Sequence, residues 1–439
     1  MVRFIGVAIG VLVCIMPSLC LAHGMVSPHP VTSRTIVFPD TSTHKTLVAD
    51  LHTHSVFSDG HVWPTVRVAE AERDGLDAFA VTEHLEYQPH ITDIPHPDRN
   101  RAWLEAKRAA ANLDLMVIPG VEITRLGDPG HINAVFITDA NELVARQEEL
   151  RRQEEHMFDT REDAENFAIT ESDGAFRGAH QVEHEGRQVW MPFEDQATYF
   201  TLVTFSYADT RPPEDVLQTA NEQGAFLFWN HPEFDSVDAG LNEFHSNAIE
   251  AGLLHGIEIA NGNRYYQNAH RLALEHDLAL IGVSDVHELI DWDYRPEAAE
   301  NPGHRPVTLI FADEKTPESM RDALFARRTV VWWKDTLIGR PEHLLPLLQA
   351  SVEIAEMEPT SWGIRVLLRN HSSSRMTLRN DTGLQPSIHA QLIELPAHGE
   401  TEVTFTMDEP AKVPLTFTVL NALVAPNQPA ELTLDPLSR

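Results

Sequence analysis

The chain has 439 residues, with 33 Lys and Arg against 66 Asp and Glu and only two Cys, and 42% of the residues are hydrophobic. This length predicts two or three domains with ample cores, and the composition excludes both a small disulfide scaffold and a generally disordered chain. The formal net charge of −33 makes nucleic acid and anionic membranes unfavourable surface partners, because both would be repelled. An anionic substrate would therefore need a locally positive site.

Residues 1–22 have the pattern of a cleaved secretory signal peptide. Arg3 is followed by an apolar run and then by small residues near Ala22, and this run is shorter than the roughly 20 residues of a spanning helix. We therefore expect a periplasmic or secreted protein without a stable membrane anchor. Cys14 and Cys20 would leave with the signal, which excludes thiolate catalysis and cysteine-ligated metal in the mature chain. A metal site would have to use imidazole and carboxylate groups.

Strand-like and helix-like segments alternate over residues 46–345, after a lead-in at residues 23–45. This alternation predicts an α/β domain of parallel strands joined by helical crossovers. The expected strands are 46–51, 76–81, 115–118, 132–137, 225–229, 256–259, 278–283, 307–311 and 330–333, and the expected helices are 66–74, 101–112, 213–222, 266–277 and 317–327.

Two other segments interrupt or follow this pattern. Residues 139–208 are charge-rich and too long for an ordinary connection, so we expect an insertion that begins with a helix over 142–156 and continues as loop-like sequence. Residues 346–439 contain short alternating apolar runs separated by Pro, Gly, Ser and Asn. This spacing predicts a small antiparallel β-sandwich with a structural or partner-contact role.

Histidines and carboxylates stand where the expected strands end. His52 and His54 close the first strand, and because they are two residues apart their side chains project to the same side. A lone HxH pair is weak evidence in a chain with 24 His. Asp59 follows in a Ser-Asp-Gly turn that can fold back over the strand end. Later strand ends carry His84, Glu122, His231, Asp285 and His287, and His131 begins another strand.

This positional preference predicts a metal site. The carboxyl ends of the strands form the catalytic face of α/β barrels, whereas solvated residues would show no such placement. Imidazole and carboxylate ligands without thiolate suit Zn, Mn or Fe. Several bound dications would also supply the positive charge that an acidic chain otherwise lacks.

The motifs DLHTH, SDG, TEH, PGVE, NHP and SDVH, in this order over about residues 46–335, resemble those of the PHP (polymerase and histidinol phosphatase) superfamily of metal-dependent phosphoesterases. Longer stretches, including SDGHVWPTVRVAEA and NGNRYYQNAHRLAL, resemble secreted bacterial phosphodiesterases of the Sb-PDE group. The resemblance implies a distorted (β/α)7 barrel with a trinuclear metal centre, followed here by the β-sandwich. We expect two or three divalent metal ions (Zn, Mn or Fe) per chain. Glu83 stands where much of the family has Asp.

The resemblance also implies roles for single residues. Glu122 would bridge two ions, and Glu122, Asp285 and Arg264 are the residues that we expect to act in catalysis. The implied metal ligands are His52, His54, Asp59, His84, Glu122, His131, His231, Asp285 and His287.

Substrate contacts are expected in loops near these ligands. Arg99, Arg101 and Arg264 could bind phosphate oxygens, and surface pairing with carboxylates is the alternative for each. Trp63 and Tyr87 could line a pocket for an ester group, although aromatic residues near strand ends more often serve packing.

The leading hypothesis is an exported phosphodiesterase that hydrolyses a small or medium organic phosphodiester through attack by a metal-activated hydroxide on phosphorus. A phosphomonoesterase of the histidinol-phosphate or nucleotide type, on the same barrel, is the alternative within the enzyme class. A non-catalytic metal-binding or scaffold protein is the alternative from another class. The oligomeric state is not predicted.

Overall fold

A computed structural model of the chain describes residues 35–90, 93–125, 129–144, 157–171, 178–184, 186–192, 211–233, 240–294, 303–387, 391–408 and 411–436. The expected signal at residues 1–22 lies outside these ranges, as do residues 23–34 of the lead-in and residues 145–156 of the helix expected over 142–156. Among the described residues, none of the helices combines the length and the apolar character needed to cross a membrane.

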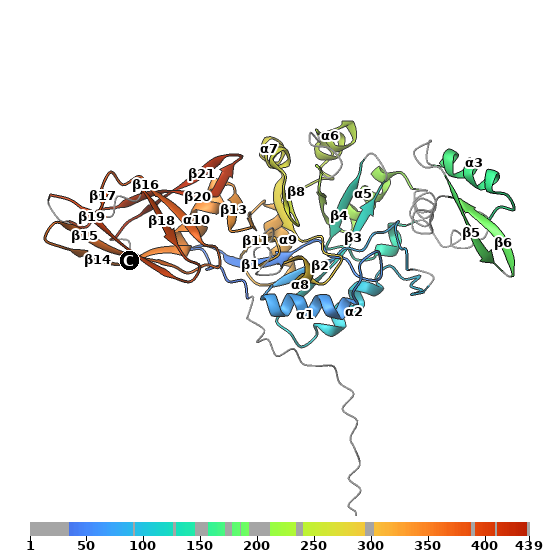
Figure 1. Cartoon of the computed structure of the whole chain (residues 1–439), viewed down its shortest axis with the longest axis horizontal. Coiled ribbons are helices and arrows are strands. Elements are labelled where there is room, and N and C mark those ends of the chain that lie inside the picture. Colours follow the sequence, from blue (N-terminus) through green and yellow to red (C-terminus); the bar gives the residue numbers. More distant parts are fainter. Residues whose placement is uncertain are drawn as a thin grey trace, which may run out of the picture. The chain divides into compact units, whose positions relative to one another are not determined.

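A barrel wall of strands surrounds one core, in the hydrogen-bonding order β1–β2–β3–β4–β7–β8–β10 (Figure 1). The wall closes beyond the ends of β10 and β1, where Thr53 bridges Val286 in parallel and Asp285 N donates to His52 O over 3.0 Å. The first and last of the histidine-bearing segments are therefore adjacent. The strands are β1 (Lys45–Asp50), β2 (Ala78–Val81), β3 (Met116–Thr124), β4 (His131–Val135), β7 (Phe226–Trp229), β8 (Gly256–Asn261) and β10 (Ala279–Val283).

The wall is mixed, which corrects the expectation of parallel strands throughout. The pairs β1–β2, β2–β3, β7–β8 and β8–β10 are parallel, whereas β4 runs antiparallel to both β3 and β7. Only six residues separate Thr124 from His131, too few for the helical crossover that a parallel connection needs. Because β4 runs in the opposite direction, its first residue, His131, pairs with Thr124 at the end of β3.

Helices cover the wall, and capping residues define several of their starts. Thr316 accepts a hydrogen bond from Ser319 N before α9, and Asn242 accepts one from His245 N before α6. The helices are α1 (Pro64–Asp74), α2 (Arg101–Ala109), α5 (Pro213–Glu222), α6 (Glu243–Glu250), α7 (Gln267–Glu275), α8 (Ile290–Asp293), α9 (Pro317–Phe325) and α10 (Pro341–Ser351), with the 3₁₀ turn η1 (Ala140–Glu142).

The insertion contains regular structure that its charged sequence obscured. A helix, α3 (Arg161–Glu171), precedes a hairpin of β5 (Ala179–His184) and β6 (Arg187–Pro192), where loop-like sequence was expected. Gly186 turns the hairpin with φ 78°. The buried residues of β6 that the structure describes are Val189, Met191 and Pro192, so the apolar face is too short to dominate the charged residues around it.

Three antiparallel strands lead from β1 to the C-terminal domain: β11 (Val307–Ala312), β12 (Thr329–Trp333) and β13 (Thr336–Gly339). Strand β13 then pairs in parallel with β20. Figure 1 shows the later strands, orange to red, gathered in an all-β body. They are β14 (Val352–Pro359), β15 (Gly363–Asn370), β16 (Met376–Asn380), β17 (Gln385–Pro386), β18 (Leu392–Leu395), β19 (Glu400–Thr406), β20 (Leu415–Ala425) and β21 (Gln428–Leu434), and the short β9 (Arg264–Tyr265) belongs to the barrel.

The C-terminal strands confirm the expected antiparallel β-sandwich. One sheet has the order β14–β15–β19–β17. In the other, β16 and β21 pair antiparallel with β20, and β18 pairs antiparallel with β16. Helix α10 spans position 346, at which the sequence pattern changes, and β14 follows it directly at Val352.

Candidate metal centre

His52 and His54 follow β1 and point into the end of the barrel. Both side chains are fully buried, and their Nε2 atoms lie 3.0 Å apart. Two nitrogens bound to one ion at about 2.1 Å in tetrahedral geometry lie about 3.4 Å apart. The spacing of the two imidazoles is therefore close to that of two ligands of one cation.

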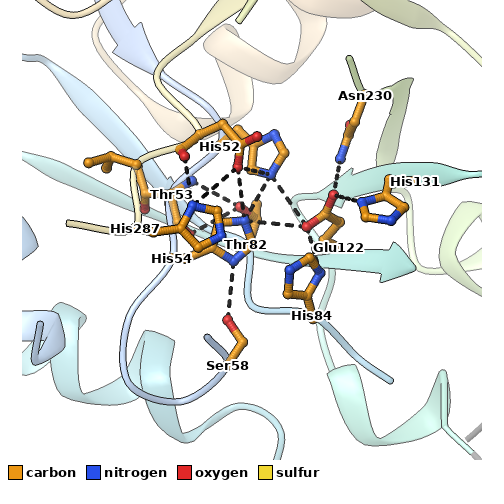
Figure 2. A network of polar contacts seen from close by, with 12 residues as sticks. His52, Thr53, His54, Ser58, Thr82, His84, Glu122, His131, Asn230 and His287 are labelled. Atoms are coloured by element: carbon orange, nitrogen blue, oxygen red, sulfur yellow. Dashed lines mark hydrogen bonds and ion pairs between the residues drawn. The ribbon is translucent and has the colours of Figure 1, made fainter. Parts of the chain in front are cut away.

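Glu122, in β3, is the carboxylate around which the other side chains gather. Figure 2 shows it between His84 and His131, with Asn230 donating to it. The Oε2 atom is 2.8 Å from His84 Nδ1, 3.3 Å from His54 Nε2 and 3.5 Å from His52 Nε2. The Oε1 atom is 2.9 Å from His131 Nδ1, 2.8 Å from Asn230 Nδ2 and 3.6 Å from His231 Nε2.

Asp59, Asp285 and His287 form the more open side of the site. Their side chains are 24%, 18% and 33% exposed. Asp59 Oδ1 lies 3.1 Å from His287 Nε2, and Asp285 Oδ1 lies 3.1 Å from His52 Nε2. The turn that carries Asp59 needs Gly60, because a Cβ there would meet the backbone of Ser55 at 2.7 Å.

All nine positions expected as ligands therefore converge on one end of the barrel. Seven of them make up three overlapping groups in which one ligand atom from each residue lies within 4.8 Å of the others. His231 and Asp285 join through the contacts given above. The groups are His54, Asp59, His84 and His287; His52, His54 and Glu122; and His84, Glu122 and His131.

Two buried oxygen atoms test whether these residues suit metal ions. Glu122 Oε2 and Asp59 Oδ1 are inaccessible to solvent, and neither accepts a hydrogen bond from a described residue. Such atoms are costly to bury unless a cation or donor faces them. Each faces imidazole nitrogens at 2.8–3.8 Å, so carboxylate and imidazole lone pairs point to shared spaces. This donor set fits divalent ions such as Zn, Mn or Fe.

The electrostatics match a site built around positive charge. Burial disfavours the imidazolium of His84, but Glu122 and Asp59 outweigh it and raise its pKa well above the ordinary value. The same competition raises the pKa of His287 to about 9 through Asp59 and Asp285. Burial opposes ionisation of Glu122, yet His84 and His52 hold its pKa well below the usual range. The carboxylates are therefore ionised at neutral pH.

Polar residues behind the ligands fix their orientation. Ser58 Oγ lies 3.1 Å from His54 Nδ1 and donates to Glu83 at 2.5 Å. Glu83 also accepts from Ser55 N at 3.1 Å, so it holds the turn before Asp59. Thr124 Oγ1 lies 2.6 Å from His84 Nδ1.

Arg67 was missed by the sequence reading. Its guanidinium, in α1, is 2% exposed and donates to His54 O at 2.8 Å and His287 O at 2.8 Å. It therefore joins the two adjacent ligand segments at the closure of the barrel. Arg67, Glu70 and Asp74 recur at spacings of three and four residues on the buried face of α1. A charged stripe beside Val68 and Ala71 is the signal that could have revealed them.

The expected substrate contacts are placed less uniformly. Arg101 begins α2, where its Nη1 donates to Pro95 O at 2.8 Å and its guanidinium lies over the Phe57 ring at 5.2 Å. Arg99 is half-buried, and its backbone N donates to Asn141. Arg264 is exposed in β9, and its backbone is paired with that of Asn261 in β8. The side chain of Asn261 donates to Asp285 Oδ2 at 3.1 Å. Of the three arginines, Arg264 has the most direct link to the proposed ligands.

The two aromatic candidates differ in the same way. Trp63 precedes α1 and packs against Phe57, with ring centroids 5.0 Å apart, in the hydrophobic core. Tyr87 lies 5.8 Å, between ring centroids, from the imidazole of His84 and is half-buried. Tyr87 is therefore beside the site, whereas Trp63 has a packing role.

Comparisons with known proteins agree with this geometry. A two-domain protein of Bacteroides vulgatus that contains a predicted PHP-like metal-dependent phosphoesterase is 32% identical, with a TM-score of 0.71, and the match covers 91% of this chain and 97% of that one. Residues 351–435 match a family model described as an Ig-like domain. The search among curated proteins gave no match.

More distant solved structures share less. An amidohydrolase of Chromobacterium violaceum is 18% identical, covering 65% of this chain and 97% of that one, with a TM-score of 0.35. The lesion-specific endonuclease Q of Pyrococcus furiosus is 14% identical, covering 72% and 62%, with a TM-score of 0.34. At these scores, neither likeness bears on the activity of this chain.

Proposed function

The chain belongs to the PHP-like metal-dependent phosphoesterases, and from this premise we propose that it hydrolyses a small or medium organic phosphodiester with two or three divalent metal ions. The observation that carries the proposal is the set of three overlapping ligand groups joined through Glu122, His54 and His84. Ions held there would lower the pKa of a water and neutralise the charge of the phosphate group.

Three residues have roles of their own in the proposed reaction. Glu122 would be a ligand in two of the three groups and would contribute carboxylate oxygens to the metal ions. Burial opposes ionisation of Asp285, but His52 and neighbouring histidines hold its pKa well below the ordinary value, so it can accept a hydrogen bond from the attacking water. Arg264 would bind a phosphate oxygen. The water oxygen forms a bond to phosphorus, the ester P–O bond breaks, and the leaving alkoxide takes up a proton.

A diester is favoured over a monoester on two grounds. The longer sequence stretches resemble secreted phosphodiesterases, and the guanidinium of Arg101 is already engaged by Pro95 O and the Phe57 ring. A monoester dianion carries one more negative charge than a diester and would gain more from such a cation.

The test is hydrolysis of bis(p-nitrophenyl) phosphate against p-nitrophenyl phosphate after chelator treatment and addition of Mn or Zn. We expect metal-dependent turnover with a preference for the diester. Metal-dependent turnover with a clear preference for the monoester would replace the diester proposal, and no metal-dependent turnover of either substrate would overturn the hydrolase proposal. The matched variant Arg264→Gln should weaken turnover, whereas Arg101→Gln should change it less.

We also propose that the enzyme acts in the periplasm or outside the cell. The support is the basic residue and apolar run within residues 1–22. The acidic composition supports a small-molecule substrate over nucleic acid bound along the surface. Fractionation of the native host, with detection of the chain in the periplasm or medium, tests this location, and recovery only in the cytoplasm would contradict it.

A further inference from the structure

Glu258 is a fully buried carboxylate behind His52 that is not among the nine expected ligands. It stands in β8, and its side chain has no exposed surface. Its Oε1 lies 2.7 Å from His52 Nδ1. Its Oε2 accepts hydrogen bonds from His231 N at 2.7 Å and from Asn261 Nδ2 at 2.9 Å. Both oxygens are therefore directed at residues that hold or adjoin the proposed metal ligands.

The contact with His52 selects one form of that imidazole. An ionised carboxylate accepts hydrogen bonds, so His52 carries its proton on Nδ1 and leaves the lone pair on Nε2. This Nε2 atom is the one that faces Glu122 at 3.5 Å and Asp285 at 3.1 Å. Glu258 thus turns the ligating nitrogen of His52 toward the shared space.

The contacts through Oε2 lead to two residues with unusual backbone conformations. His231 has φ 25° and Asp285 has φ 51°, values that non-glycine residues adopt rarely. Glu258 binds the backbone N of His231 directly. Asn261 Nδ2, which donates to Glu258, also donates to Asp285 Oδ2 at 3.1 Å. One carboxylate therefore supports ligand candidates that follow β1, β7 and β10.

The charge of Glu258 also requires compensation. The described residue within ion-pair distance of it is His52, which is neutral when its Nε2 lone pair is free, and a buried carboxylate without a cation nearby is costly. A divalent ion on the far side of the His52 imidazole would supply that charge. A carboxylate that accepts the proton of one ring nitrogen also makes the other ring nitrogen a stronger metal ligand.

We propose that Glu258 is a positioning residue that orients His52, His231 and Asp285 and sets the affinity of the metal held on their side of the site. This inference rests on the metal centre of the proposed function. On the other side, Asp59, His84 and His287 contact one another and Glu122 or Asp285, and no described contact joins them to Glu258. Loss of Glu258 should therefore weaken metal binding on the side of His52 and His231 more than on the side of Asp59 and His84.

The test compares Glu258→Gln and Glu258→Asp with the parent chain by elemental analysis after dialysis and by chelator competition with Zn and Mn. We expect Glu258→Gln to bind part of its metal about 10- to 100-fold more weakly and to retain the remainder, with Glu258→Asp intermediate. Asp77→Asn is the control, because Asp77 stands just before β2, at the opposite end of that strand from His84, where it accepts from Val48 N at 2.8 Å. This variant should keep the parent's metal content.

Unchanged metal affinity in Glu258→Gln would overturn the inference, as would an equal loss of all metal. If Glu258→Gln does not fold, Asn261→Ala decides by the same measurement, because it removes the hydrogen bonds that join Glu258 to Asp285 and leaves the contacts of Glu258 with His52 and His231. Because the readout is metal affinity, a parent chain that binds metal but cleaves no phosphoester would overturn the proposed function and leave this inference standing.

Discussion

The inner and outer sides of the site differ in how tightly their residues are held. His52, His54 and Glu122 have side chains that are at most 1% exposed, and each contacts several partners from other strands. Asp59 and His287 are 24% and 33% exposed and lie in turns beyond the strand ends. The inner side therefore has the character of a preorganised core, and the outer side is where a substrate and an exchangeable ion have access.

The largest effect is expected from Glu122→Ala, which tests the buried inner side. Glu122 belongs to two of the three ligand groups, one with His52 and His54 and one with His84 and His131. We therefore expect loss of metal together with a fall in turnover of at least about 1,000-fold, equivalent to about 4 kcal/mol of transition-state stabilisation. Metal content and turnover are measured on the same preparation. Glu105→Ala, on the surface of α2 beside Arg108, is the control. Turnover near the parent level in Glu122→Ala would locate the chemistry elsewhere.

His287→Ala tests the outer side. We expect it to lower turnover about 10- to 100-fold, equivalent to about 1.4–2.8 kcal/mol. Much of the metal should stay bound, because His287 is absent from the two ligand groups that contain Glu122. The measurement pairs elemental analysis with turnover, and the exposed His276→Ala is the control. If His287→Ala lost all metal, as expected for Glu122→Ala, the two sides would form one indivisible unit.

A smaller effect is expected from pH. Carboxylates raise the pKa of His287 to about 9, and they raise those of His52 and His84 as well. In metal-free protein, the stability from a raised histidine pKa is fully present below about pH 6.5 and is lost as pH rises through 9. Metal binding requires neutral imidazole, so metal affinity should rise over the same interval.

Thermal unfolding of chelated and metal-loaded protein between pH 6 and 9.5 measures both trends. The melting temperature of the chelated protein should fall across this range, and the gap between the two preparations should widen. A chelated protein whose melting temperature does not change with pH would show that these histidines are not paired with carboxylates in solution.

The ligand positions could be predicted because each signal is local. His52 and His54, or Asp285 and His287, are recognised within a few residues at the end of a strand, and α/β barrels bring such ends together. The alternating pattern predicted the strands of the barrel wall and the helices α1, α2, α5, α7 and α9, but not α6, α8 or α10. The direction of β4 could have been inferred from the six residues before His131, but the alternating pattern alone favoured parallel strands throughout.

The supporting contacts could not be predicted in this way. Glu258 and His52 are 206 positions apart, and nothing near either residue indicates that they meet. The carbonyl oxygens that Arg67 binds leave no trace in the amino-acid sequence, since any residue type has one. The substrate contacts were uncertain for a similar reason, because the alternative partner of Arg101 is a backbone oxygen and an aromatic ring.

The pairing of β13 with β20 has a consequence for how the two domains depend on each other. Leu337 and Ile338 pair with Ala422 and Leu423, so an Ig-like strand continues the sheet that starts in the barrel. A chain cut near residue 351 would retain all nine proposed ligands and yet expose a buried apolar strand as a free sheet edge, which invites aggregation. The C-terminal domain would then keep the barrel soluble rather than contribute to its chemistry.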